Sequence, residues 1–294
     1  MRLISSRTDT GATLGVVVGD RWLPASDVID GGPRTMAELI AGGTTSLVVL
    51  RDGIDGAGIP ERGHRLADAD LLAPVTRPGK IVAIGRNYRE HATEEGVEPP
   101  PAPLIFAKWP SSLVGHGAEV CWDPDLSEQV DYEAELAVVI GRTARHVSVD
   151  HALDHVLGYT CLNDVSARDL QFGDGQWIRG KSLDTFCPMG PALVTADEVG
   201  DPQDLAIRCS VGDELVQDAR TSAMYFSVAE IISYCSRSFT LEPGDVIATG
   251  TPGGVGVFRD PPRFLGDGDR ITVEIERIGR LENTCRSQRV RAVA

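Results

Sequence analysis

The stretch DYEAELAVVIG, residues 131–141, places an acid at every second position: Asp131, Glu133 and Glu135. The chain then continues directly into the apolar run 136–140. Because alternate side chains of a β-strand lie on one face, this pattern predicts three crowded carboxylates beside a strand that enters the core. A charged strand edge facing solvent would tolerate them, but no Lys or Arg within the stretch compensates the repulsion. A bound cation is the alternative.

A second acidic segment, CLNDVSARDLQ at residues 161–171, follows a predicted helix that returns the chain toward the first. Its Ser166 and Asp169 have the spacing of a capping box, which leaves Asp164 free to point elsewhere. Hard divalent cations prefer carboxylate oxygens, and Mg²⁺ usually keeps waters that a substrate can replace. The sequence therefore predicts a Mg²⁺ site formed by Glu133, Glu135 and Asp164.

The segment GRNYREHATEEG, residues 85–96, carries His91 and Glu94 three positions apart, on the same side of a helical turn. One interpretation is an exposed, charged helix. The other is a dyad in which Glu94 orients His91 as a general base. The Pro-rich residues 94–103 that follow suggest a segment that orders over a ligand.

Two further segments carry polar groups suited to an anionic ligand. Lys181 in WIRGKSLDTFCPMGP, residues 177–191, is a surface residue or a cation that stabilises an enolate or carboxylate. The Gly-rich ATGTPGGVG, residues 248–256, lacks the ending of a P-loop, so we expect no nucleotide there. His151 and His155 are interpreted as surface residues rather than zinc ligands.

The chain divides into a small N-terminal α/β module, residues 1–72, and a larger domain, residues 73–294. The module begins with a strand pair around Gly19-Asp20 and has a capping-box pattern at Thr35 and Glu38 before a Gly stop. The larger part predicts mostly strands, with helices over 148–157 and 227–236, the second with a capping box of its own. No βαβ alternation is evident, so we expect a β-rich α+β fold.

The composition excludes several classes of partner. A net charge of −15 over 294 residues argues against a nucleic-acid or anionic membrane surface. No apolar run approaches the roughly 20 residues of a membrane span, and the first residues do not form a signal peptide. The six cysteines include no CxxC pair. We expect a cytoplasmic protein with free thiols.

Seven strings in this order resemble the fumarylacetoacetate hydrolase family, over roughly residues 75–285. They are GRNYREHATE, PLIFAKWPSSLVG, DYEAELAVVIG, GYTCLNDVSARDLQ, RGKSLDTFCPMGP, SVAEII and LEPGDVIATGTPGGVG. The resemblance implies a mixed β-roll catalytic domain, a homodimer, and one Mg²⁺ or Mn²⁺ held by Glu133, Glu135 and Asp164, with Asp131 behind them.

The same resemblance assigns roles to the remaining candidates. It implies a catalytic His91–Glu94 dyad and a catalytic Lys181. It also implies substrate contacts, for which we take Arg86, Gln171 and Thr251. Gly175 stands where the fumarylacetoacetate-cleaving branch has a tyrosine, which argues against fumarylacetoacetate as the substrate.

These residues predict a Mg²⁺-dependent hydrolase or decarboxylase of small anionic 2-oxo or 1,3-diketo acids, such as acylpyruvates or oxaloacetate, acting through a metal-stabilised enolate. Two alternatives stay open. One is a 2-hydroxyhepta-2,4-diene-1,7-dioate isomerase or 5-oxopent-3-ene-1,2,5-tricarboxylate decarboxylase of aromatic catabolism. The other is a non-catalytic domain that binds a metal or a dicarboxylate, which would need no general base.

Overall fold

A twelve-stranded sheet forms the centre of the protein in the computed structural model, which describes residues 1–9, 11–54 and 56–289. Ten strands follow one another across it: β4 (His64–Arg65), β3 (Arg21–Pro24), β2 (Gly11–Val18), β1 (Arg2–Thr8), β14 (Cys187–Thr195), β12 (Val156–Asn163), β11 (Ala134–Ile140), β17 (Val246–Ala248), β6 (Ile81–Gly85) and β7 (Leu104–Lys108). β5 (Leu71–Leu72) pairs with β1, and β8 (Leu113–Val114) pairs with β14. The predicted β-rich fold is confirmed.

The strand β11 explains why an apolar run follows the acids. Leu136, Val138 and Ile140 belong to one hydrophobic core, and Ala137 and Val139 to a second core on the other side of the sheet. Both faces of the strand are buried, so the run shows no polar alternation. The acidic end of β11 therefore lies at the edge of two cores.

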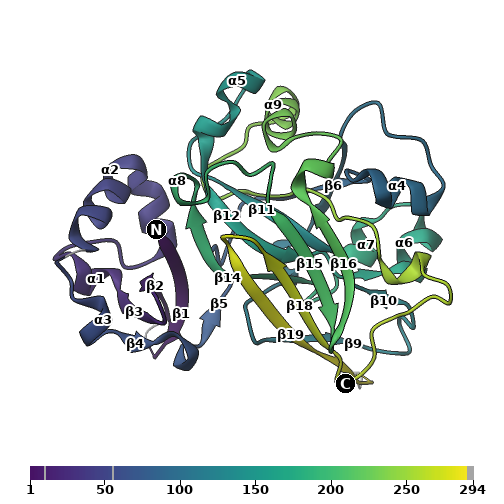
Figure 1. Ribbon diagram of the computed structural model, residues 1–294, viewed down its shortest axis with the longest axis horizontal. Coiled ribbons are helices and arrows are strands. Elements are labelled where there is room, and N and C mark those ends of the chain that lie inside the picture. The colour runs from purple at the N-terminus through teal and green to yellow at the C-terminus, as the bar shows by residue number, and fades with distance from the viewer. Residues whose placement is uncertain (10, 55, 290–294) are drawn as a thin grey trace, which may run out of the picture.

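A five-stranded sheet lies in front of the central sheet in Figure 1 and shares the first of these cores. Its order is β16 (Glu214–Arg220), β15 (Ala206–Val211), β18 (Arg270–Ile275), β19 (Gly279–Ser287) and β9 (Glu119–Trp122). A third, two-stranded sheet joins β10 (Val130–Asp131) to β13 (Ser166–Ala167). This short sheet brings the two acidic segments of the sequence together.

The N-terminal module contains the expected strand pair, β2 and β3, around Gly19-Asp20. Its helices are α1 (Ala25–Val28), α2 (Met36–Ile54) and α3 (Ile59–Arg62), with the 3₁₀ turn η1 (Leu66–Asp68). The expected Gly stop is a kink, because α2 continues beyond Gly43, whose φ is 56°. The module joins the larger part through β1, which pairs with β14 beside it (Figure 1). The boundary at residues 72–73 stays a prediction, and residues 290–294 of the larger part lie outside the described residues.

The remaining helices belong to the larger part. They are α4 (Arg89–Glu95), η2 (Pro110–Ser112), α5 (Val149–Ala152), η3 (Leu153–His155), α6 (Arg168–Asp174), α7 (Ile178–Lys181), α8 (Ala196–Val199), η4 (Thr221–Ala223), α9 (Val228–Ser238) and η5 (Gly256–Phe258). In α9, Ser227 and Glu230 form the predicted capping box.

Two local expectations are wrong. The helix predicted over 148–157 ends at Ala152, and Val156 and Leu157 already belong to β12, whose two faces pack in different cores. Ser166 and Asp169 form no capping box. Asp169 instead accepts hydrogen bonds from the Ser127 hydroxyl (2.7 Å) and the Glu128 amide (3.2 Å).

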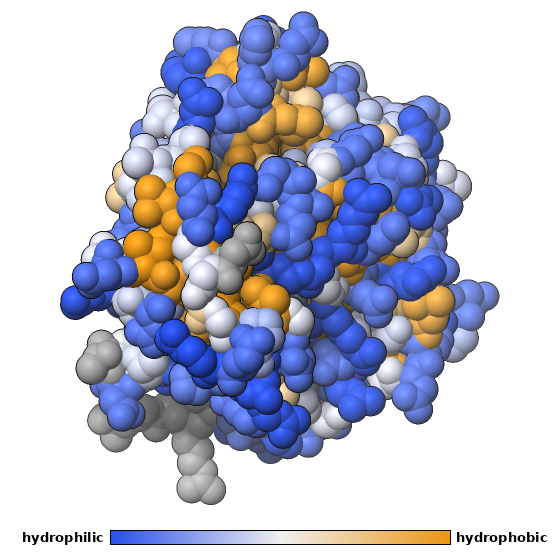
Figure 2. All heavy atoms as spheres, turned by 60° about the vertical axis from the view of Figure 1, so that its left-hand side comes forward, coloured by the Kyte–Doolittle hydropathy of each residue, from blue (hydrophilic) through white to orange (hydrophobic). Residues whose placement is uncertain are grey.

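Hydrophilic residues cover much of the face shown in Figure 2, where the N-terminal module comes forward and hydrophobic residues form patches between them. Among the described residues, no helix is long and apolar enough to cross a membrane.

Candidate active site

Glu133, Glu135 and Asp164 meet at the end of the β11–β12 pair. Since Ala134 of β11 pairs with Asn163 of β12, the residues just outside this pair also face each other. The Asp164 amide donates to the Glu133 carbonyl (2.9 Å). One carboxylate oxygen from each of the three acids lies within 4.8 Å of the others, and all three residues are buried.

Three cations that come from elsewhere in the chain balance the crowded carboxylates. The Lys181 ammonium contacts Glu133 (2.8 Å) and Asp164 (2.9 Å). The Lys108 ammonium lies 2.5 Å from the other oxygen of Asp164 and also contacts the Lys181 carbonyl. The Arg168 guanidinium lies 2.7 Å from Glu133. We call these six side chains, Glu133, Glu135, Asp164, Lys108, Arg168 and Lys181, the floor of the site.

Asp131 serves a separate purpose, because the strand is interrupted between β10 and β11. Its carboxylate accepts hydrogen bonds from Arg168 (2.9 Å) and from the amides of Gly256 (2.8 Å) and Val257 (3.0 Å). A Cβ atom at Gly256 would lie 1.9 Å from the Arg263 carbonyl, so only glycine fits there. Asp131 thus holds Arg168 toward Glu133.

The charges of the floor shift its pKa values in opposite directions. Burial alone would raise the pKa of Glu133, but Lys181 and Arg168 lower it to about 2. Burial lowers the pKa of Lys181, and Asp164 and Glu133 outweigh that effect and raise it. Burial, together with the neighbouring Asp164 and Glu133, raises the pKa of Glu135.

Glu135 differs from the other two acids because its carboxylate accepts from the Gly250 amide (2.7 Å), and no Lys or Arg among the described residues contacts it. A cluster of three carboxylate donors, one of which has no cationic partner, fits a hard divalent cation. The residues therefore fit the implied metal.

The opposite side of the site is formed by β6 and α4, and we call Arg86, His91 and Glu95 its rim. His91 is 7% exposed, and its Nδ1 has no hydrogen-bond partner among the described residues. Burial lowers the pKa of His91. The Arg86 guanidinium contacts the Glu95 carboxylate through two nitrogens, with Nε at 2.7 Å, and lies 5.6 Å from the centre of the Trp177 ring.

Glu94 lies on α4 but points away from His91. Both of its carboxylate oxygens accept from the Gly254 amide, at 2.9 and 3.0 Å. No hydrogen bond joins it to His91 in the part of the chain that the structure describes. The dyad stays a prediction.

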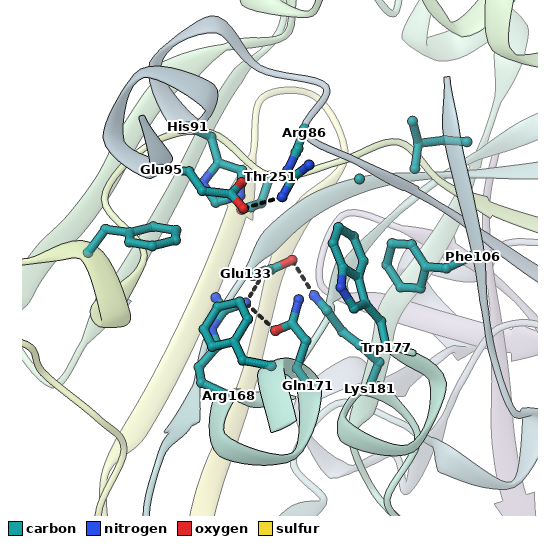
Figure 3. A pocket seen from close by; sticks show the side chains of 14 residues that line it. Arg86, His91, Glu95, Phe106, Glu133, Arg168, Gln171, Trp177, Lys181 and Thr251 are labelled. Atoms are coloured by element: carbon teal, nitrogen blue, oxygen red, sulfur yellow. Dashed lines mark hydrogen bonds and ion pairs between the residues drawn. The ribbon is translucent and has the colours of Figure 1, made fainter. Parts of the chain in front are cut away.

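The rim and three members of the floor, Glu133, Arg168 and Lys181, line a cavity of about 20 Å³. Figure 3 shows Arg86, His91 and Glu95 on one side and Glu133, Arg168, Gln171 and Lys181 on the other. The cavity is lined by Ile84, Gly85, Arg86, His91, Glu95, Phe106, Glu133, Arg168, Gln171, Phe172, Trp177, Lys181, Thr251 and Phe258. A Cβ atom at Gly85 would lie 2.6 Å from Trp177, so this glycine lets the indole approach.

The cavity brings together most of the candidates from the sequence. Arg86, His91, Gln171, Lys181 and Thr251 all line it, as does the metal ligand candidate Glu133. Gln171 accepts from Arg168 (3.0 Å), and Thr251 accepts from Gln217 (2.8 Å). Glu135, Asp164 and Glu94 are not among the lining residues.

Sequence reasoning missed Lys108, Arg168, Glu95 and Trp177. Arg168 lies in the quoted segment SARDLQ, three positions before Gln171, which is the spacing of one helical turn. Lys108 ends the apolar strand LIFAK, an unusual place for an exposed lysine. The positions of Arg168 and Lys108 were visible in the sequence, but neither position indicates which carboxylate the side chain contacts.

The profile described as fumarylacetoacetate (FAA) hydrolase C-terminal matches residues 80–286. The chain belongs to this family. The predicted resemblance is confirmed, and with it membership in a family of enzymes.

Two relatives and two solved structures illustrate the similarity. The chain is 47% identical over 253 residues to "Oxaloacetate tautomerase FAHD2A, mitochondrial" of Homo sapiens, covering 85% of this chain and 79% of the relative. It is 44% identical over 259 residues to "Oxaloacetate tautomerase YisK" of Bacillus subtilis, covering 85% and 86%. The fumarylacetoacetate hydrolase of Exiguobacterium antarcticum has 39% identity and a TM-score of 0.84, covering 98% of this chain and 100% of that one. The 2-hydroxyhepta-2,4-diene-1,7-dioate isomerase of Mycobacterium marinum has 35% identity and a TM-score of 0.74, covering 98% and 99%.

Proposed function

We propose that this protein is a tautomerase that interconverts the keto and enol forms of oxaloacetate or a closely related small 2-oxo acid. The observation that carries the proposal is the position of His91 across one small cavity from the cationic Lys181, with an Nδ1 that has no hydrogen-bond partner among the described residues. The names of the relatives, at 44% and 47% identity over 85% of the chain, support this reaction.

Glu133, Glu135 and Asp164 would hold the metal, for which Mg²⁺ or Mn²⁺ suits the oxygen donors. When bound, such an ion acts as a Lewis acid on the oxygens of a 2-oxo acid. The side chains of the protein supply the proton chemistry. Burial lowers the pKa of His91, so its imidazole is neutral near pH 7 and accepts a proton.

In the proposed reaction, His91 takes a proton from C3 of the keto acid. The C3–H electron pair forms the C2–C3 double bond, and the 2-oxo oxygen becomes negative. Lys181 is cationic, because its two carboxylate partners raise its pKa, and it stabilises this oxygen. A proton from solvent completes the enol, and His91 releases the proton from C3 to solvent. The reverse sequence returns the keto form.

The contacts of Glu94 favour tautomerisation over hydrolysis. Cleavage of a C–C bond by water needs a base that activates the water, and the predicted dyad would supply it. Here Glu94 binds the Gly254 amide instead. A reaction without an attacking water needs only His91. Hydrolysis, decarboxylation, isomerisation of longer dioates, the homodimer and the cytoplasmic location stay predictions.

The test follows the enol of oxaloacetate by its ultraviolet absorbance, with Mg²⁺ and then with EDTA. A protein-free sample with the same Mg²⁺ corrects for the spontaneous reaction. We expect fast, metal-dependent loss of the enol without formation of pyruvate. Formation of pyruvate at the same rate would show a decarboxylase, and an unchanged enol would overturn the proposal.

A substitution links the reaction to the carboxylate cluster. We expect Glu133→Gln to abolish both metal binding, measured by calorimetry, and turnover, because it removes one charged ligand and one partner of Lys181. The matched control is Glu119→Gln on β9, since this acid is half exposed and pairs with Arg286 away from the cavity. Retained activity in Glu133→Gln would contradict the assignment of the site.

A further inference from the structure

Little free space separates the side chains that line the cavity. Its 20 Å³ accommodates about one water molecule. Some of the lining must therefore move before a 2-oxo acid enters. Which side chain moves depends on how each is held.

Several ion pairs hold the side chains of the floor, whereas a single ion pair holds Glu95 of the rim. Glu95 is the last residue of α4 and is followed by Gly96, whose φ is 69°. Its carboxylate binds Arg86, and no other hydrogen bond or ion pair of this carboxylate is found within the described residues. A rotation of the Glu95 side chain alone would open the cavity on the α4 side.

Arg86 has support that does not depend on Glu95. Its guanidinium lies 5.6 Å from the centre of the Trp177 ring, a cation–π contact. Its backbone has φ of 56°, in the left-handed region that non-glycine residues seldom occupy. Such conformations cluster at functional sites, where the surrounding structure imposes them. Arg86 is therefore presented to the cavity whether or not Glu95 binds it.

We propose that Arg86 binds the carboxylate at the far end of the substrate, and that Glu95 occupies this position while no substrate is bound. The inference rests on the proposed function and specifies the substrate class as dicarboxylates. Guanidinium and carboxylate form two parallel hydrogen bonds, so the exchange of one carboxylate for another conserves the ion pair.

The exchange also explains selectivity. A substrate whose far end is uncharged would have to leave the Arg86–Glu95 pair intact or leave both groups unpaired. Unpaired, partly buried charges are costly. Glu95 thus disfavours monocarboxylates of similar shape, and only a second carboxylate of the ligand compensates its displacement.

Calorimetric titration with two ligands that do not react tests the proposal. Malate and 2-hydroxybutanoate share a 2-hydroxy carboxylate, and only malate carries a second carboxylate. Both are titrated with saturating Mg²⁺ into the intact protein. We expect the protein to prefer malate.

Two substitutions should act in opposite directions. Arg86→Gln should weaken the binding of malate about ten- to hundredfold, which corresponds to the loss of a charge-assisted hydrogen bond. The affinity for 2-hydroxybutanoate should stay nearly unchanged. Glu95→Gln should strengthen the binding of malate several-fold, because a neutral amide replaces the carboxylate that competes for Arg86. The control Arg208→Gln removes an arginine that pairs with Asp218 and does not line the cavity.

The outcomes separate the two proposals. Equal weakening of both ligands by Arg86→Gln, weaker malate binding by Glu95→Gln, or no preference for malate in the unaltered protein would overturn the inference. Thermal melting checks that each variant folds, and Glu95→Gln remains decisive if Arg86→Gln does not. Because neither ligand reacts, the expected pattern without turnover of oxaloacetate would refute the tautomerase and leave the carboxylate subsite standing.

Discussion

The floor of the site takes its buried charged groups from strands, from the residues next to strand ends and from short helices, whereas the rim takes Glu95 from the end of the seven-residue α4. In the floor, Glu133 and Asp164 each contact two cations. In the rim, Glu95 contacts one. The floor is thus fixed by a network, while the rim contains a pair that one side-chain rotation opens.

The difference suggests a division of labour. A network of buried charges holds its geometry because breaking one contact leaves the others uncompensated. Such a site suits the ionic chemistry of a reaction. A single pair at the entrance suits exchange with a ligand. Substitutions in the floor should therefore change stability and rate together, and substitutions on α4 should change mainly rate or affinity.

Lys181→Met should give the largest effect. It leaves Glu133 and Asp164 buried with one cation fewer, so we expect a loss of activity of about 10³-fold or more and a drop of about 3–5 kcal/mol in the free energy of unfolding in EDTA. Urea unfolding and the enol assay measure the two effects. Lys80→Met is the control, since the Lys80 side chain is partly exposed and its buried partner Asp245 keeps hydrogen bonds from the amides of Lys80 and Glu242. Unchanged stability would mean that the floor is not a network.

His91→Gln should lower the rate without lowering stability. The imidazole is the proposed base, and general acid–base groups contribute about 10²–10⁴-fold. Its Nδ1 has no hydrogen-bond partner among the described residues, so little is lost from the folded state. Steady-state kinetics and urea unfolding are compared on the same sample. If His91→Gln lowered stability as much as Lys181→Met, residues of α4 would contribute to stability as the floor does, and the proposed difference between the two would be wrong.

The pH profile sharpens the role of His91. Burial lowers its pKa from the ordinary value of 6.5, so the neutral form persists at lower pH than in a free imidazole. Because the base must be unprotonated, kcat/KM should be flat near pH 7 and fall about tenfold per pH unit once the pH drops below that pKa. The acid limb should be absent from the residual activity of His91→Gln. If kcat/KM fell on the acid side with a midpoint above pH 6.5, another group would be the base.

Glu94→Gln should give the smallest effect, less than about tenfold in kcat/KM. Glu94 holds the Gly254 amide rather than His91. A neutral amide oxygen still accepts that hydrogen bond. If Glu94→Gln costs as much as His91→Gln, the dyad operates and hydrolysis becomes the better proposal.

The metal cluster could be predicted from the sequence because it depends on local geometry. Glu133 and Glu135 are two positions apart, and Asp164 directly follows the strand paired with theirs. The cations could not be predicted as partners. Lys108 lies 56 positions from Asp164, and only the folded sheet brings it there.

Other misses have a physical cause in burial. Val156 and Leu157 fit a helical stripe as well as a strand buried on both faces, so periodicity alone did not separate the two. Asp131 was grouped with Glu133 and Glu135 by alternation, but the break between β10 and β11 turns it toward Arg168. The pairing of β1 with β14 connects segments that no local pattern relates.

That pairing sets an order of events during synthesis. Arg2 and Leu3 of β1 leave the ribosome before their partners Val194 and Leu193, which are made last among the strands that flank β1. At about 5–20 residues per second, this edge waits about 10–40 s for β14. Unpaired strand edges pair readily with other chains. A nascent or truncated chain that stops before β14 would therefore expose at β1 a strand edge that can pair with other chains.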